Sequence, residues 1–325
     1  MAAKQEKAEA TPKHVLCENA IKHDLRGVWP SISVNKEGSV IMVYQHWKPG
    51  LKGISHGIYY CQGTLKDKKI TWGVEQTLET EGCSAPKVSI ADNGTIVHIY
   101  GKGTRCYYRT GSTQKSEVTW DPEQMIDEGN QPCVSVAENR VVIAFISNNH
   151  GYAQVGAIDS SPKKIVWKED KFELTPDKVD DLAVAINQNK DAVVAYRTGL
   201  VKSMVHCKYG KIEGGQIVFT GSAAGGAAPA EKELKGYYPT VSLNKNGRIL
   251  VVFEQLSPLR KIFAQYGEVE RSGGGIQWRE EAPDCIDNGH RPSVSLTEKG
   301  EFVEIHESHL PVVDQSMFYR IGQLL

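Results

Sequence analysis

The chain has 325 residues, a formal net charge of −1 and 40% hydrophobic residues, enough apolar material for a large core. This neutral balance argues against a nucleic-acid partner, because such domains carry a clear basic excess. No apolar run reaches the roughly 18 residues of a membrane span, and no apolar segment typical of a signal peptide follows the N-terminus.

The seven cysteines are odd in number and lack the Cys-x-x-Cys spacing of metal sites. Cys61, Cys106 and Cys207 fall inside predicted strands. We therefore expect buried free thiols without disulfides, no bound metal and no cofactor. Together with the lack of a leader, this favours a cytoplasmic protein, unless it leaves the cell by an unconventional route or the sequence lacks its leader.

The N-terminal residues predict a tail followed by one isolated strand. Residues 1–13 are rich in Ala, Lys, Glu and Gln and are expected to be disordered. Segment 14–24 precedes the first Gly-x-x-Pro as 278–287 precedes the last one. Because the last repeat stops after its third strand, at Leu325, we expect 14–24 to supply its fourth strand and remove the open sheet edge.

From residue 27 onward one pattern recurs six times, with a period of about 50 residues. Each copy has a Gly, a Pro a few residues later, an alternating run, a tight turn and a second, more apolar run. The copies begin at Gly27, Gly82, Gly129, Val179, Gly236 and Gly289, and in the fourth copy Leu182 takes the place of Pro. The pattern is typical of the blades of a β-propeller.

Each copy predicts four strands. In the first run Ile32 and Val34 alternate with Ser31 and Ser33, as expected for a strand with two different faces. A Gly- and Asn-containing turn leads to a buried second strand such as 40–44. A third run ends at Gly, and a fourth opens on an aromatic, as in Ile70-Thr-Trp72. We predict an all-β chain: one six-bladed β-propeller of four-stranded blades over 14–325, closed by the N-terminal strand.

One loop is lengthened by the low-complexity stretch 221–230, which contains mainly Gly and Ala. A flexible insertion of this kind is either a passive surface loop or a lid.

The repeat Gly-x-x-Pro-x-Val-Ser-Leu-x-x-x-Gly, with the last copy ending Val303-Glu-Ile-His306-Glu-Ser308, resembles the sialidase-like β-propeller repeats, a family that includes propeller lectins. The resemblance implies the propeller fold and a glycan-type ligand. The sialidase catalytic set does not carry over: the turn Ser33-Val-Asn-Lys-Glu-Gly38 lacks the Asp and Trp of an Asp box. Phe318-Tyr-Arg-Ile-Gly322 echoes the sialidase Arg motif, but it recurs at 107–111 and is interpreted as a blade feature.

In a propeller the loops into each first strand and after each second strand share the axial face. The residues at these positions are polar, aromatic or charged, and they differ from blade to blade. A multivalent lectin would repeat them, so we predict one composite, asymmetric site for a glycan or other small polar or aromatic molecule. The candidate ligand-binding residues are Trp29, His46, Trp47, Asn148, His150, Asp181, Arg197, Tyr238, Glu254, Arg291, His306 and Glu307.

Several candidates have more than one interpretation. Arg197, Glu254 and Glu307 share one structural position, where Arg197 and Glu254 either form an ion pair that plugs the channel or anchor a ligand. His306 replaces the Tyr or Phe of the other blades and is either a hydrogen-bonded core residue or a titrating group facing the pocket. The pair Asp180-Asp181 suggests acid–base chemistry, a cation site or a solvated loop, and Trp29, Trp47, Tyr237 and Tyr238 either stack on a ligand or pack between blades.

Three functions follow as hypotheses. The first is a lectin-like binding module. The second is an enzyme with a single axial pocket, for which His306, Glu307, Glu254 and Arg197 are the catalytic candidates. The third is a protein-interaction scaffold. The expected partner is a small molecule or glycan, with no nucleic acid and no membrane span.

Overall fold

The computed structural model describes residues 15–50, 53–79, 82–114, 117–159, 164–199, 202–220, 232–256, 259–270, 274–279, 282–309 and 314–325, with the backbone alone at 47–50, 53–56 and 114. The predicted tail 1–13 and the stretch 221–230 lie outside these residues. The described residues contain strands and turns but no helix, and therefore no helix that could cross a membrane.

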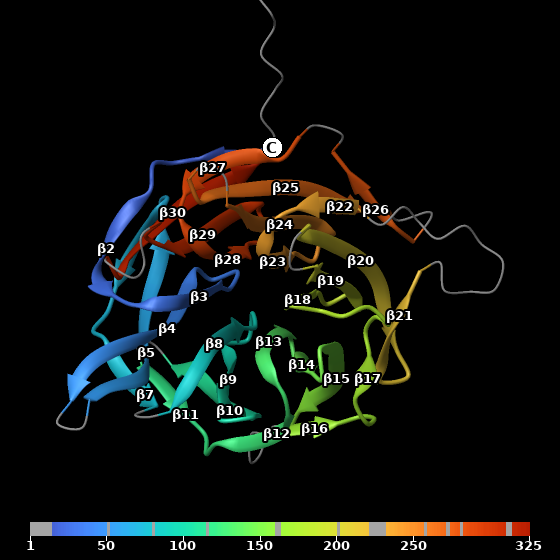
Figure 1. The fold of residues 1–325 in the computed structure, drawn as a ribbon, viewed down its shortest axis with the longest axis horizontal. Coiled ribbons are helices and arrows are strands. Elements are labelled where there is room, and N and C mark those ends of the chain that lie inside the picture. The colour runs from blue at the N-terminus through green and yellow to red at the C-terminus, as the bar shows by residue number, and fades with distance from the viewer. Residues whose placement is uncertain are drawn as a thin grey trace, which may run out of the picture.

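Six antiparallel sheets stand around a central axis like the blades of a propeller (Figure 1). This confirms the predicted all-β, six-bladed fold. Blade 1 contains β3 (Val28–Val34), β4 (Ser39–Gly50), β5 (Gly53–Lys66), β6 (Lys69–Trp72) and β7 (Gln76–Glu79). Blade 2 contains β8 (Cys83–Ile90), β9 (Thr95–Lys102), β10 (Arg105–Gln114), β11 (Glu117–Trp120) and β12 (Gln124–Glu128). Blade 3 contains β13 (Asn130–Ala137), β14 (Arg140–Ser147), β15 (His150–Ile158), β16 (Ile165–Trp167) and β17 (Phe172–Glu173).

The second half of the ring repeats this order. Blade 4 contains β18 (Asp181–Ile186), β19 (Asp191–Thr198), β20 (Met204–Glu213), β21 (Gln216–Phe219) and β22 (Lys232–Lys235). Blade 5 contains β23 (Tyr237–Leu243), β24 (Arg248–Gln255), β25 (Lys261–Val269), β26 (Ile276–Trp278) and β27 (Asp284–Asn288). Blade 6 contains β28 (His290–Leu296), β29 (Glu301–Glu307), β30 (Ser316–Leu324), β1 (Val15–Cys17) and β2 (Ile21–Arg26). In each blade the last two strands both pair with the third, so they are two pieces of one interrupted outer strand.

The N-terminal strand closes the ring as predicted. β1 pairs antiparallel with β30, with Val15 opposite Leu324 and Cys17 opposite Gly322. β2 continues along the same edge, with Ile21 opposite Tyr319. The last blade is therefore built from both ends of the described chain.

The glycine near the end of the third strand has a packing reason. Gly63 lies opposite Trp72, and a Cβ placed on it would meet the indole at 2.9 Å. Gly111 and Gly267 lie in the same way beneath Trp120 and Trp278. The aromatic ring occupies the space that a side chain on the glycine would fill. This explains why the glycine of the third strand and the aromatic residue of the fourth recur together in the sequence.

The serines of the first strands join neighbouring blades. The Ser33 hydroxyl accepts a hydrogen bond from the backbone N–H of Ile90 in the next blade, at 3.1 Å. The same bond links Ser89 to Val136, Ser135 to Ile186, Ser242 to Leu296 and Ser295 to Val34. Each first strand is the inner edge of its sheet, and these bonds satisfy N–H groups that the sheet leaves unpaired. In blade 4 the corresponding residue is Ala185, which cannot make this bond.

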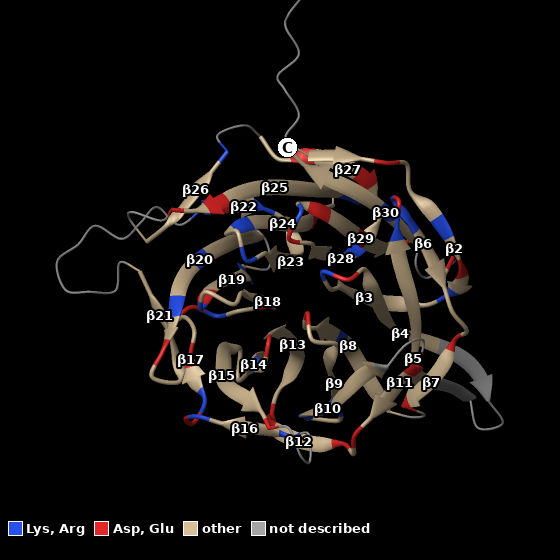
Figure 2. Cartoon of the chain, turned by 180° about the vertical axis from the view of Figure 1, so that it is seen from behind, with Lys and Arg blue, Asp and Glu red and all other residues tan. Residues whose placement is uncertain are grey.

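The core lies between the blades, where second strands such as β14 and β24 are buried over most of their length. All seven cysteines are free, as predicted, and Cys61, Cys83, Cys106, Cys133 and Cys207 are buried. The Tyr-Arg pattern is confirmed as a blade feature, because Arg109 in β10 pairs with Glu79 and Arg320 in β30 pairs with Asp287. Figure 2 shows acidic and basic residues interspersed around the ring.

Candidate ligand-binding site at the axial mouth

A small cavity of about 40 Å³ lies where the first strands begin, and all six blades line it. We call it the axial cavity. Its lining residues are Trp29, Pro30, Ala85, Lys87, Gln131, Pro132, Asp181, Leu182, Tyr238, Pro239, Arg291 and Pro292. The predicted residues Trp29, Asp181, Tyr238 and Arg291 therefore meet around one space, and the residues before each Pro converge as expected.

A backbone bulge directs these side chains. Trp29, Ala85, Gln131, Tyr238 and Arg291 each precede a Pro and have φ between 47° and 54°. In each of these five blades the strand register shifts at this point, as between Val28 and Ser31. Left-handed conformations are costly for bulky residues, and bulges re-aim side chains next to functional sites. Blade 4, with Leu182 in place of Pro, has no register shift here.

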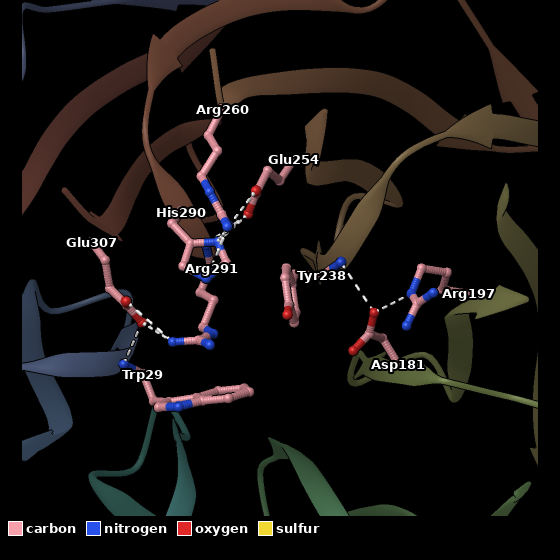
Figure 3. Close-up of polar contacts among 9 residues, drawn as sticks. All are labelled: Trp29, Asp181, Arg197, Tyr238, Glu254, Arg260, His290, Arg291 and Glu307. Atoms are coloured by element: carbon pink, nitrogen blue, oxygen red, sulfur yellow. Dashed lines mark hydrogen bonds and ion pairs between the residues drawn. The ribbon is translucent and has the colours of Figure 1, made fainter. Parts of the chain in front are cut away.

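Buried carboxylates hold three of these bulges from the preceding blade (Figure 3). Glu307 accepts a hydrogen bond from the backbone N–H of Trp29 at 2.6 Å. Glu254 accepts one from Arg291 and Asp181 accepts one from Tyr238, both at 3.3 Å. The exposed fractions of Glu254, Glu307 and Asp181 are 0%, 0% and 5%. These acids thus connect blades 4, 5, 6 and 1 in sequence.

Each of the three acids also has a cationic or imidazole partner, and Arg197 and Glu254 do not pair with each other. Arg197 pairs with Asp181 through Nε and with Asp180 at 3.3 Å. Glu254 pairs with Arg260 at 3.1 Å and with His290 Nδ1 at 2.5 Å. The Arg197–Glu254 ion pair, one of the two interpretations of these residues, is therefore wrong: Asp180 and Asp181, the acids that pair with Arg197, precede it in its own blade.

Asp181 departs from the solvated-loop and acid–base interpretations of the Asp180-Asp181 pair. It is buried beside Arg197, so it is not part of a solvated loop. Burial raises the pKa of Asp181, although the adjacent Arg197 guanidinium and the Tyr238 N–H act in the opposite direction. Its two partners leave it no evident role as a free acid or base.

Two aromatic rings and one guanidinium form the wall of the axial cavity. The Arg291 guanidinium lies 3.9 Å from the centre of the Trp29 ring and 5.5 Å from that of Tyr238. Arg291 Nη1 contacts both Glu307 oxygens at 3.2 Å, which fixes the guanidinium in this position. The Trp29 and Tyr238 rings are half-buried and meet edge to face at 6.1 Å. Such a wall offers both ring surfaces and hydrogen-bond donors to a ligand.

Lys87 is a lining residue that the sequence analysis missed. It follows Pro86 in β8, where the other blades carry the smaller residues Ser31, Cys133, Ala183, Thr240 and Ser293. Burial lowers the pKa of Lys87, and the nearby charge of Arg291 acts in the same direction. The sequence did contain a signal: when the six repeats are aligned, Lys87 is the one charged residue at a position where the other five repeats have small residues.

His306 does not line the axial cavity, and its position supports the core interpretation. Its ring lies across Gly289, as those of Tyr44 and Phe253 lie across Gly27 and Gly236. It is 1% exposed, contacts Glu304 at 3.0 Å and lies 3.4 Å from Asp287. It borders a separate cavity of about 300 Å³ near Leu259 and Phe318.

The other candidates lie away from the axial cavity. His150 pairs with Glu173 of the outer strand at 2.8 Å, and Asn148 is exposed in the turn before it. His46 packs edge to face against Tyr59. The backbone of Trp47 belongs to β4, and its side chain lies outside the described residues.

The opposite end of the channel is polar. A cavity of about 130 Å³ there is lined by Lys36, Asp92, Glu138, Lys245 and Glu298, among others. Gln188 of blade 4 donates a hydrogen bond to Asp92 of blade 2 at 2.8 Å. Within the described ranges, no group of three or more His, Cys, Asp or Glu side chains is arranged to hold a metal ion.

Comparison with known proteins supports the fold. No protein-family model and no curated protein matches the chain. Among solved structures, a Dyadobacter fermentans protein of unknown function has 12% identity and a TM-score of 0.67, covering 96% of this chain and 100% of that one. The NanB sialidase of Streptococcus pneumoniae has 10% identity and a TM-score of 0.58, covering 90% and 68%. The Penicillium chrysogenum α-L-arabinanase complexed with arabinobiose has 11% identity and a TM-score of 0.55, covering 92% and 94%. The chain thus has a sialidase-like six-bladed propeller fold.

Proposed function

We propose that this chain is a ligand-binding propeller that holds one glycan or other small polar molecule at its axial mouth. The observation that carries the proposal is the composition of the axial cavity. Trp29, Tyr238, Arg291, Lys87 and Gln131 reach it from five different blades, and no two are alike. A lectin with one pocket per blade would repeat its contact residues, so this asymmetry favours a single site.

The aromatic pair supports a ligand with a flat or pyranose face. Trp29 and Tyr238 are half-buried and line the axial cavity. Their left-handed backbone positions carry a conformational cost of about 1–3 kcal/mol each. Strain retained at a cavity rim is consistent with a binding role. Sugars are also the ligand class of the arabinobiose-bound arabinanase, which shares the fold.

The buried acids do not favour glycoside hydrolysis. Both usual mechanisms need two carboxyl groups that can reach the glycosidic bond. Glu254 and Glu307 are 0% exposed, and each already binds a backbone N–H and a cationic side chain. The enzyme hypothesis becomes one outcome of the experiment below.

A thermal-shift screen with mono- and disaccharides, followed by calorimetry, tests the proposal. We expect a stoichiometry of one ligand per chain. Trp29→Ala and Tyr238→Ala should each weaken binding by about tenfold or more through lost stacking and buried area. Trp278→Ala is the matched control, because this ring covers Gly267 on an outer strand and should affect stability without changing affinity.

Three outcomes would reject the proposal. Several equivalent sites would indicate a multivalent lectin. A ligand consumed during the assay would indicate an enzyme. Unchanged affinity in both Trp29→Ala and Tyr238→Ala would place the ligand elsewhere, and a protein-interaction scaffold would then be the better hypothesis.

A further inference from the structure

Lys87 lines the axial cavity, and none of the described acidic residues forms an ion pair with it. By contrast, Arg197, Arg260 and Arg291 each have an acid partner. An isolated charge in a partly desolvated space is unfavourable unless something pairs with it. A negatively charged group from outside the chain would therefore be stabilised next to Lys87.

The neighbouring acids are already engaged. Asp181 is bound by Arg197 and the Tyr238 N–H, and Glu307 by Arg291 and the Trp29 N–H. Both lie near enough to Lys87 to raise its pKa, but neither offsets the desolvation that lowers it. Asp181 and Glu307 thus join neighbouring blades, and neither forms an ion pair with Lys87.

A second cationic side chain lines the same cavity. Arg291 lines the axial cavity, and its Nε is a buried atom with no hydrogen-bond partner among the described residues. Its Nη1 is held by Glu307, so the orientation of the guanidinium is set in advance. A buried N–H without an acceptor is unfavourable, so Arg291 retains a donor that Glu307 does not satisfy.

The size of the cavity limits what can enter. About 40 Å³ accommodates roughly three water-sized groups, since one water needs about 10–15 Å³ on the same measure. A carboxylate or a comparable small anion fits, whereas a sugar ring does not. A ring would have to remain outside, against Trp29 and Tyr238.

We propose that Lys87 and Arg291 form an anion site at the base of the axial mouth, which binds the acidic group of the ligand. This inference rests on the proposed function, because it specifies the chemistry of the buried end of the same ligand. The ligand class is then an acidic sugar or another small molecule that joins a ring to a carboxylate or phosphate.

Saturation-transfer difference NMR with acetate tests this without requiring a ring. We expect wild-type protein to transfer magnetisation to the acetate methyl group, with saturable millimolar binding. Titration with inorganic phosphate then distinguishes the two sources of charge: displacement of acetate indicates a site open to both anions, and no displacement indicates a carboxylate site.

Lys87→Ser is the decisive variant. Serine is the residue that blades 1 and 6 carry at this position, where Ser31 and Ser293 accept hydrogen bonds from Val88 and Ile32 of the next blade. It therefore suits the scaffold. It should bind acetate at least tenfold more weakly, because a charge-assisted hydrogen bond is lost. Lys36→Ser, which removes the same charge at the other end of the channel, should bind acetate like the wild type.

Absence of transfer to acetate in the wild type would overturn the proposal, as would equal acetate affinity in wild type and Lys87→Ser. Neither result depends on the glycan screen. Failure of the anion site would leave the ring contacts of Trp29 and Tyr238 to be judged by their own variants, and failure of those variants would leave the acetate result intact.

Discussion

Each residue of a blade can be compared with the residues at the same position in the other blades. The residues that differ in charge or polarity from these counterparts have the most unusual chemical environments. His98 is one of these residues. The strand registers place it level with Met42, Ile143, Val194, Val251 and Glu304. It is 0% exposed, its Nδ1 donates a hydrogen bond to the Lys87 carbonyl, and its Nε2 has no described partner. The fold thus requires this imidazole to be neutral.

His98 should make the stability of the fold sensitive to acid. Burial lowers the pKa of His98 to about 3, whereas the unfolded chain titrates near 6.5. Between these values the unfolded state binds a proton that the folded state excludes. The free energy of unfolding should therefore be highest above about pH 6.5. It should fall by about 1.4 kcal/mol per pH unit as the pH decreases from there towards 3. Urea unfolding at pH 7, 5.5 and 4.5 measures this slope.

His98→Met, which introduces the residue of blade 1, should flatten the slope. His150→Met is the control, because His150 is half-buried at the periphery and pairs with Glu173. It should leave the acid sensitivity of His98 in place. Identical slopes for wild type and His98→Met would contradict the assignment.

At the scale of the strand, the seams between blades are not equivalent. Serine hydroxyls at one repeated position connect first strands across the other seams, but Ala185 interrupts the series between blades 4 and 5. The same blade lacks the bulge that the other blades form before Pro. Asn187 offsets part of this loss by donating a hydrogen bond to the Asn244 carbonyl at 3.1 Å.

Ala185→Ser should restore the missing bond to the backbone N–H of Leu243 and stabilise the protein by about 0.5–1.5 kcal/mol. Ser33→Ala should have the opposite effect and cost about 1–3 kcal/mol, because it leaves the Ile90 N–H without its acceptor. Denaturant unfolding of the two variants measures both changes. Ala195→Ser, which buries a hydroxyl in the adjacent strand, is expected to destabilise. Destabilisation by Ala185→Ser would show that this seam cannot accept the hydroxyl.

Across the whole molecule, stability depends on the joining of the two ends in blade 6. β1 and β2 cover the edge of β30, and Val15 belongs to the core cluster that contains Ile262 and Phe302. Removal of these strands would expose both a sheet edge and the apolar side chains beneath it.

Deletion of residues 1–24 should therefore lower the unfolding temperature far more than deletion of residues 1–12, and should promote aggregation. Calorimetry and light scattering on the two truncated proteins measure these effects. Equal stability of the two would mean that the ring does not depend on β1 for closure.

The sequence alone determined the fold because the fold is repetitive. Gly63 with Trp72, or Ser33 with Ile32, are local requirements of one blade, and six copies of such a pattern give a reliable signal. The position of β1 also followed from the sequence, since the last repeat lacked one strand. The axial location of Trp29, Tyr238 and Arg291 could be predicted for the same reason: their place in the repeat fixes where they lie.

The pairing of charges was decided only by the tertiary structure. Arg197 and Glu254 occupy equivalent positions, but whether two side chains from neighbouring blades meet depends on rotamers and on nearer competitors, and Asp181 of the same blade is the nearer partner of Arg197. The site also depended on the bulges, which turn five residues towards the axis by a left-handed backbone that the Gly-x-x-Pro pattern does not specify. Likewise, only the assembled ring shows that no described residue forms an ion pair with Lys87, because the nearby acids Asp181 and Glu307 lie in other blades and pair with arginines there.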